Sequence, residues 1–133
     1  MRQIQSLYAR GNVLARNFRN CNISVKTQLF KTYCTNFYCG HLWSDFSSKC
    51  YNKLRVAYNN VFRALFNFER DVSISSSMLE LNINHFSIIM RKQIYNFMCR
   101  LESSENLLIY TILTSKYFRR SAMHCKWTDV LYT

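Results

Sequence analysis

The sequence predicts an all-α protein, a compact bundle of four to five helices joined by short loops. Composition carries this prediction: the chain has no proline and only two glycines, and 49% of its residues are hydrophobic. Proline and glycine interrupt helices, so their scarcity favours long helices over turn-rich β structure. Apolar residues also recur at helical spacing in each long segment. With 133 residues the chain has the length of one domain, enough to bury a substantial core.

The first expected helix covers about residues 4–18, and its apolar face contains Leu7, Leu14 and Phe18. Gly11 lies on the same face, although glycine lowers helix propensity by about 1 kcal/mol relative to alanine. We therefore expect the backbone of another element to approach the helix closely at this glycine.

The second expected helix covers about residues 25–38. Asn22 or Ser24 is suited to cap its N-terminus, because both side chains can accept a hydrogen bond from a free backbone N–H. Gly40 is placed to end it as the residue after the C-cap.

The third expected helix, about residues 50–68 with Ser47 or Ser48 as its cap, has the most regular pattern in the chain. Its apolar face consists of Cys50, Leu54, Ala57, Tyr58, Val61, Phe62, Leu65 and Phe68. Its polar face consists of Lys49, Lys53, Asn60, Arg63 and Asn67, with Arg55 and Asn59 at the edge. We predict that the apolar face packs in the core and that the polar face is exposed.

The rest of the chain is expected to form a loop over 71–77, a helical turn over 78–81, and two further helices. Asn84 is placed to cap the fourth long helix, and a final helix runs to about residue 113. Periodicity is lost from Arg119. We therefore expect residues 1–118 to form a single helical domain and residues 119–133 a tail.

The charge is strongly positive and unevenly distributed. Eighteen basic and seven acidic residues give a net charge of +11, and six basic residues but no acidic one precede Asp45. Such a field attracts polyanions at long range, and binding through phosphate contacts depends on salt. A basic surface also attracts acidic membranes and acidic proteins, so the charge alone does not specify nucleic acid.

The cysteines and the chain's hydropathy favour an intracellular location, with the nucleus among the candidate compartments. The sequence begins without the apolar segment of a secretory signal, and no stretch reaches the ~18 apolar residues of a membrane span. The six cysteines therefore indicate reduced thiols rather than a disulfide framework, and we expect no membrane partner.

Patterns for catalysis and metal binding are weak. Glu102 and Glu105 are the closest helical carboxylate pair, but they lie among serines at a helix junction, where capping explains acidic residues. Cys34, Cys39, His41 and Cys50 lack the compact second pair of a structural zinc site. We predict no catalytic residue, no metal and no cofactor.

Three phrases together resemble one known family. They are "LYARGNVLARNF" from Leu7, "LRVAYNNVFRALF" from Leu54 and "IMRKQIYNFMCRLESSEN" from Ile89. The linking segment "VKTQLFKTYCTNFYCGHLW" from Val25 resembles the same family at the corresponding position. The chain from about Ser6 to Tyr117 resembles the region after the catalytic core in reverse transcriptases of LINE-like (non-LTR) retrotransposons. The resemblance implies a helical thumb that grips the template–primer duplex.

The same resemblance implies that the chain is not an enzyme by itself. The family's polymerase chemistry needs a palm domain with a Tyr-Ala-Asp-Asp-type loop, and this sequence contains no such tetrapeptide and no adjacent acidic pair. It therefore resembles a fragment that lacks the palm, and the expected partner is the backbone of an RNA or DNA duplex.

The expected nucleic-acid-binding residues are cations and amides that could donate to phosphate oxygens. In the first phrase, Arg10, Gly11, Asn12 and Arg16 match the family's motif. In the third helix, Arg55, Asn59 and Arg63 match it. Spacing adds Arg19, Lys49, Lys53 and Asn60. Such polar stripes are also the ordinary solvated faces of helices.

Two alternatives stay open. The aromatic residues Tyr8, Tyr33, Phe37, Tyr58, Phe62 and Tyr95 could stack on bases, although most fall on apolar faces and favour core packing. The alternative function is an orphan helical interaction domain without a nucleic-acid role. It would bind a palm domain or another protein through an exposed apolar surface.

Overall fold

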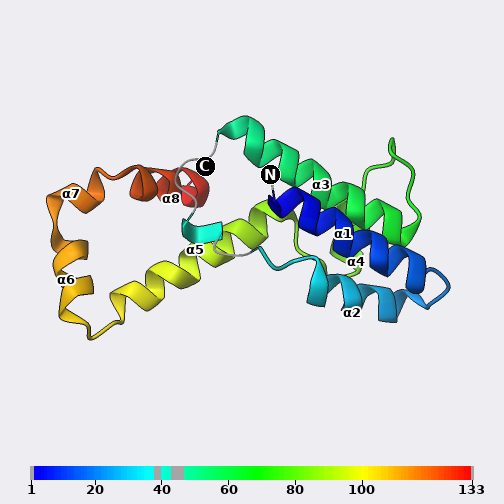
Figure 1. Ribbon diagram of the computed structural model, residues 1–133, viewed down its shortest axis with the longest axis horizontal. Helices are drawn as coiled ribbons and strands as arrows, with labels where there is room; N and C mark the ends of the chain where they lie inside the picture. Colours follow the sequence, from blue (N-terminus) through cyan, green and yellow to red (C-terminus); the bar gives the residue numbers. More distant parts are fainter. Residues whose placement is uncertain (1, 38–39, 43–46, 133) are drawn as a thin grey trace. The chain divides into compact units, whose positions relative to one another are not determined.

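The computed structural model describes residues 2–37, 40–42 and 47–132 (Figure 1). Within these ranges the protein is all-α, as predicted, with 76% of the chain helical and no strand. The described part contains eight α-helices, six of them with seven or more residues, so the expectation of four to five helices is wrong. Short helices such as α4 (Ser75–Glu80) and α7 (Lys116–Arg119) are too brief to show a periodic pattern in the sequence.

The chain forms two compact units. Unit 1 comprises Met1–Tyr38 and Ser47–Ser87, and unit 2 comprises Cys39–Phe46 and Ile88–Thr133. The helix α5 (Phe86–Glu102) contributes its first two residues to unit 1 and the rest to unit 2. Each unit is described below by itself.

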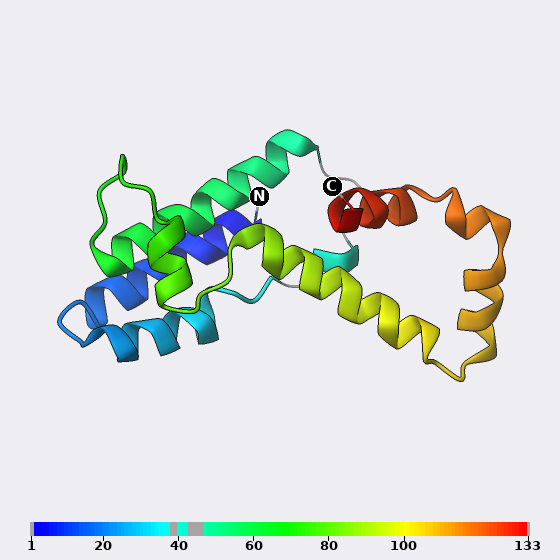
Figure 2. The same cartoon turned by 180° about the vertical axis from the view of Figure 1, so that it is seen from behind.

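Unit 1 is built on the packing of α1 (Arg2–Asn17) against α3 (Ser48–Phe66). The two helices lie side by side in both the front view and the view from behind (Figures 1 and 2). Leu7, Gly11 and Leu14 form the buried side of α1, as expected from its pattern. The close neighbour of Gly11 is the side chain of Val61 in α3, rather than a backbone.

The core of unit 1 is aromatic. The ring centroid of Phe30, in α2 (Ile23–Tyr33), lies 5.4 Å from that of Tyr58 and 5.6 Å from that of Phe62. Phe86 lies 5.2 Å from Phe37 and thereby joins the start of α5 to the segment after α2. Such tilted and edge-on ring pairs bury large apolar areas and add favourable quadrupole contacts.

Local capping explains where α2 and α3 begin. Asn22 caps α2, since its side-chain oxygen accepts a hydrogen bond from the backbone N–H of Val25 at 3.0 Å. Ser47 caps α3 by accepting from Cys50 N at 3.3 Å. One cap predicted for each helix is therefore confirmed.

Two predicted boundaries are wrong. The helix α2 ends at Tyr33 with Cys34 as C-cap, so Gly40 does not end it. The helix α5 begins at Phe86, and Asn84 instead accepts, through its backbone carbonyl, a 2.6 Å hydrogen bond from the hydroxyl of Tyr58.

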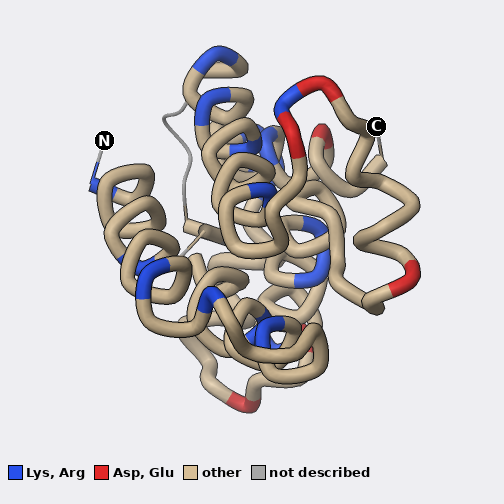
Figure 3. The backbone as a smooth tube through the Cα atoms, turned by 90° about the vertical axis from the view of Figure 1, so that its right-hand side faces the viewer, with Lys and Arg blue, Asp and Glu red and all other residues tan. Residues whose placement is uncertain are grey.

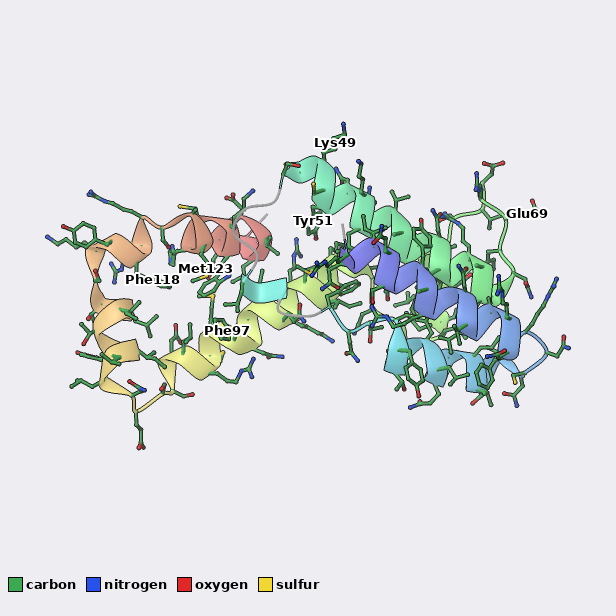
Figure 4. All side chains as sticks on the ribbon, viewed as in Figure 1. Lys49, Tyr51, Glu69, Phe97, Phe118 and Met123 are labelled. Atoms are coloured by element: carbon green, nitrogen blue, oxygen red, sulfur yellow. The ribbon has the colours of Figure 1, made fainter. Side chains whose placement is uncertain are left out.

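Unit 2 combines the short helix η1 (Gly40–Leu42) and most of α5 with α6 (Leu107–Thr114), α7 and α8 (Ala122–Tyr132). Its buried centre includes Trp127, whose ring centroid lies 5.6 Å from that of Phe97 and 6.0 Å from that of Phe118. Figure 4 shows Phe97, Phe118 and Met123 directed toward one another. The Nε of Arg91 donates to the carbonyl of Val130 at 3.1 Å and ties α5 to α8.

The segment 119–133, expected to be a tail, contains α8. Trp127 is the only buried residue of α8. A single large buried side chain produces no regular apolar stripe in the sequence, so this helix was not predicted. The helix α6 contains no charged residue, and none of its residues is buried.

Candidate nucleic-acid interface

The three long helices of unit 1, α1, α2 and α3, combine many cations with a complete lack of acidic residues. There are three basic residues in α1, two in α2 and four in α3, and none of these helices contains Asp or Glu. Figure 3 colours the basic positions blue and the acidic positions red along the chain. The positive field in unit 1 is therefore not offset by carboxylates on the same helices.

A row of polar residues runs along α1. Tyr8, Asn12 and Arg16 are spaced by four residues and so lie on one side of the helix, and all three are exposed. The amide Nδ2 of Asn60 in α3 donates to the Tyr8 hydroxyl at 3.3 Å. This contact places the α1 row next to the polar side of α3.

On α3 the neighbouring row continues from Asn60 toward the N-terminus. Lys53 lies seven residues, or about two turns, before Asn60 on the same side, and Lys49 precedes it by one more turn. Both lysines are exposed. We define the α1/α3 face as the following six residues: Tyr8, Asn12, Arg16, Lys49, Lys53 and Asn60.

Arg55 and Asn59 lie four residues apart in a second row on α3, and Arg63, one turn further on, is also three residues after Asn60. Two residues of helix correspond to roughly 200° of rotation, so Arg55 points almost opposite to Lys53. Nη2 of Arg63 donates to the carbonyl of Val72 at 3.3 Å, and its buried Nε has no hydrogen-bond partner among the described residues. Arg63 therefore holds the loop that follows α3.

Arg10 also has an internal role. Its Nε donates to the carbonyl of Ser6 at 3.3 Å and its Nη1 to that of Asn36 at 3.5 Å, so it links α1 to the segment after α2. It lines a groove of about 410 Å³ between these helices. The other lining residues are Ala9, Val13, Leu14, Phe18, Leu29 and Tyr33.

The ten predicted binding residues thus divide by exposure. Six are exposed: Asn12, Arg16, Arg19, Lys49, Lys53 and Arg55. Four are half-buried: Arg10, Asn59, Asn60 and Arg63. Asn12 and Arg16 share the α1 row with Tyr8, and the two lysines share the α3 row with Asn60, which contacts Tyr8. Arg55 points away from this α3 row, and Arg63 is engaged with the carbonyl of Val72. The sequence analysis missed Tyr8 as the link, although its spacing to Asn12 and Arg16 was a visible signal.

The aromatic residues are only partly in the core. Tyr58, Phe37 and Phe62 are buried, as the packing interpretation expected, but Tyr33 and Tyr95 are exposed. Burial raises the pKa of the Tyr58 hydroxyl, which remains a hydrogen-bond donor to Asn84. Tyr58 is therefore a structural residue.

Cys34 is also a core residue. Burial raises the pKa of its thiol to about 11, and the nearby charge of Arg10 opposes that rise only in part. A protonated thiol is a poor nucleophile and a poor metal ligand. Of the four residues weighed as zinc ligands, Cys39 and the side chain of His41 lie outside what the structure describes. Among the described side chains, no three of His, Cys, Asp or Glu are grouped to hold a metal ion.

Comparisons with protein-family models, with curated proteins and with solved structures find no match for this chain. No helix in the described ranges combines the length and apolar character needed to cross a membrane.

Proposed function

We propose that this protein is a nucleic-acid-binding module that contacts the phosphate backbone of an RNA or DNA duplex through the α1/α3 face. The single observation that carries the proposal is the juxtaposition of two polar rows, joined by Asn60 and Tyr8, on acid-free helices. Cations and amide donors arranged lengthwise along helices suit phosphate contacts, which position a duplex without reading its sequence.

The resemblance to the thumb of LINE-like reverse transcriptases gives this surface a specific context. In that context the module holds a template–primer duplex and performs no chemistry of its own. Arg16 of the first phrase lies on the α1/α3 face, whereas Arg55 and Arg63 of the second phrase do not. The proposal therefore rests on Arg16, Lys49 and Lys53 for charge, with Asn12 and Asn60 as amide donors.

The test compares two double variants that lose the same charge. In Arg16→Gln with Lys53→Gln, affinity for an RNA/DNA hybrid should fall, and the slope of log affinity against log salt should flatten by roughly two units, one for each lost phosphate contact. Both side chains are exposed, so the helical circular dichroism should be retained. Fluorescence anisotropy across a salt series measures both quantities.

The control is Arg70→Gln with Lys92→Gln. Both residues are exposed, and Arg70 lies in the loop after α3 between the acidic residues Glu69 and Asp71. A localised interface requires a smaller loss in this control than in the first pair. Equal losses would reduce the binding to general attraction by a protein of net charge +11. An absence of binding at low salt would reject the proposal.

A second function, protein association, is favoured by one observation on unit 2. The helix α6 is uncharged, and Leu107 and Leu108 are 76% and 73% exposed. Contiguous exposed apolar surface of this kind marks interaction sites in soluble proteins.

A further inference from the structure

The short helix α7 in unit 2 is held firmly in place. The ring of Phe118 packs 6.0 Å from Trp127 and 5.3 Å from His124, measured between centroids, which anchors α7 on α8. Ser115 caps the start of α7 by accepting from Tyr117 N at 3.2 Å. The backbone N–H of Ser121 donates to the carbonyl of Phe118 at 3.0 Å and fixes its end.

The anchored helix presents an aromatic ring among cations. Tyr117 is 88% exposed, and Lys116, Arg119 and Arg120 beside it are exposed as well. Residues three apart in a helical turn share a side, so Tyr117 lies near Arg120 and Lys116 near Arg119. We call residues 116–120 the Tyr117 turn.

Along the chain the charge around the Tyr117 turn has one sign, and an acidic residue near it in the structure is Glu102 of α5, which lines a pocket together with Phe118 and Arg119. No acidic residue occurs between Glu105 and Asp129, whereas Lys126 adds a fourth cation to this stretch. A ligand that matches the turn is therefore polyanionic. It also carries a flat apolar group that can stack on the exposed ring of Tyr117. Single-stranded nucleic acid meets both needs, because its unpaired bases expose their faces next to phosphates.

We infer that the Tyr117 turn is a binding site for single-stranded nucleic acid, in which Tyr117 stacks on a base and the adjacent cations contact the flanking phosphates. Two of the three cations are arginines, whose planar guanidinium groups pair with phosphate through two hydrogen bonds and also stack on bases. A duplex does not offer this contact, since its bases are stacked on each other. The site therefore differs in ligand and in residues from the α1/α3 face.

The fixed geometry of the turn favours binding. Because the packing of Phe118 and the two serine contacts already order the backbone, little conformational entropy is lost when a strand binds. Phe118, which packs against Trp127, is not itself one of the residues that would contact the ligand.

The experiment measures binding of labelled oligothymidylate of about 12 nucleotides, within the site sizes of single-strand binders. Tyr117→Ala should weaken binding about tenfold, the effect expected when one stacked base loses its platform. Tyr117→Phe should bind as the unsubstituted protein does, because stacking needs the ring and not the hydroxyl. Tyr132→Ala is the matched control, since Tyr132 is 82% exposed but lies near Asp129 and away from the cation cluster.

An abasic oligomer of the same length separates stacking from charge. It keeps the phosphates and lacks bases, so Tyr117→Ala should not change its binding. Arg119→Gln with Arg120→Gln should weaken binding to both oligomers. Tyr117→Ala should also leave hybrid-duplex binding intact, which keeps a failure here distinct from a failure of the α1/α3 face.

Three results would overturn the inference. The first is an equal effect of Tyr117→Ala and Tyr132→Ala on oligothymidylate. The second is an equal effect of Tyr117→Ala on the thymidylate and abasic oligomers. The third is loss of binding to phosphatidylcholine–phosphatidylserine vesicles in Tyr117→Ala with unchanged oligothymidylate binding, which would assign the turn to an anionic membrane surface.

Discussion

Gly11 and Val61 set the distance between α1 and α3. A Cβ atom on residue 11 would lie 2.6 Å from Cγ1 and 2.9 Å from Cγ2 of Val61, closer than non-bonded carbons approach. Val61 is itself buried on the core face of α3. A glycine in mid-helix, unfavourable for helix formation alone, is thus explained by helix–helix packing.

We predict that Gly11→Ala destabilises unit 1 by about 1–3 kcal/mol, the range for overpacking a core. This is despite the gain of about 1 kcal/mol in helix propensity from alanine. Urea unfolding followed by circular dichroism measures the change. In a Val61→Ala background the methyl groups are gone, so Gly11→Ala should become neutral or stabilising there. The same cost in both backgrounds would contradict the packing explanation.

Cys34 should make stability depend on pH in the alkaline range. Its thiol pKa rises from an ordinary 9.0 to about 11 on burial, so the folded state favours the protonated form. That contribution is fully present below pH 9 and is lost as the pH rises through 11.

We therefore predict that the free energy of unfolding falls more steeply between pH 9 and 11 in the unsubstituted protein than in Cys34→Ala. Tyr58, whose pKa is raised mainly by burial, contributes to both proteins, and Cys34→Ala removes only the smaller part of that rise, which the charge of Cys34 causes. Cys125→Ala, at an exposed position, should follow the unsubstituted curve. Parallel curves for the unsubstituted protein and Cys34→Ala would show that the thiol does not titrate in this way.

At the scale of elements, the helix with the most regular pattern was the most predictable. The apolar positions of α3 fixed its buried side, and Leu54, Val61 and Leu65 are all buried as expected. The cap at Ser47 could also be predicted, because a side-chain acceptor three residues before a backbone donor is a local feature. Both signals depend only on neighbouring residues.

Other features depend on contacts between distant residues. The pairing of Phe37 with Phe86, from segments far apart in the chain, has no local signal, and α2 ends before Phe37. For α8, a single buried tryptophan gives no periodic stripe that could distinguish a helix from a tail.

In the candidate interface, too, some features could be predicted from neighbouring residues and others depend on contacts between distant residues. The polar row of Asn12 and Arg16 was visible in the sequence of α1, and so was the charge of α3. The hydrogen bond from Asn60 to Tyr8, which brings the two rows together, spans 52 residues of sequence. The engagement of Arg63 with Val72 depends on the loop path after α3, whereas the family resemblance and the helical spacing both predict this arginine as a phosphate ligand.

At the scale of the whole molecule, the two units differ in their surfaces. The helices α1, α2 and α3 of unit 1 are basic and free of acidic residues, whereas unit 2 contains the apolar helix α6. The two proposed functions, duplex contact and protein association, are therefore assigned to separate units. Substitutions in α6 test protein association without touching the α1/α3 face.

We predict that Leu108→Gln with Ile112→Gln reduces concentration-dependent association, measured by sedimentation equilibrium. The two residues are four apart on α6 and both exposed, so they share one side of the helix and contribute little to the fold of the single chain. Helical circular dichroism should therefore be retained, and hybrid-duplex affinity of the monomer should not change.

Val72→Gln with Leu79→Gln is the matched control, because these residues of unit 1 are also exposed but do not belong to a charge-free helix. The exposed fractions of the side chains are similar in the two pairs, 44% and 79% in the control against 73% and 55% in α6. If association depends on a contiguous apolar surface, only the α6 pair should weaken it. Equal effects of the two pairs would mean that scattered exposed apolar residues cause non-specific association. An unsubstituted protein that stays monomeric at all concentrations would reject the prediction that the protein self-associates through α6. Loss of association with intact duplex binding would instead assign the two functions to the two units.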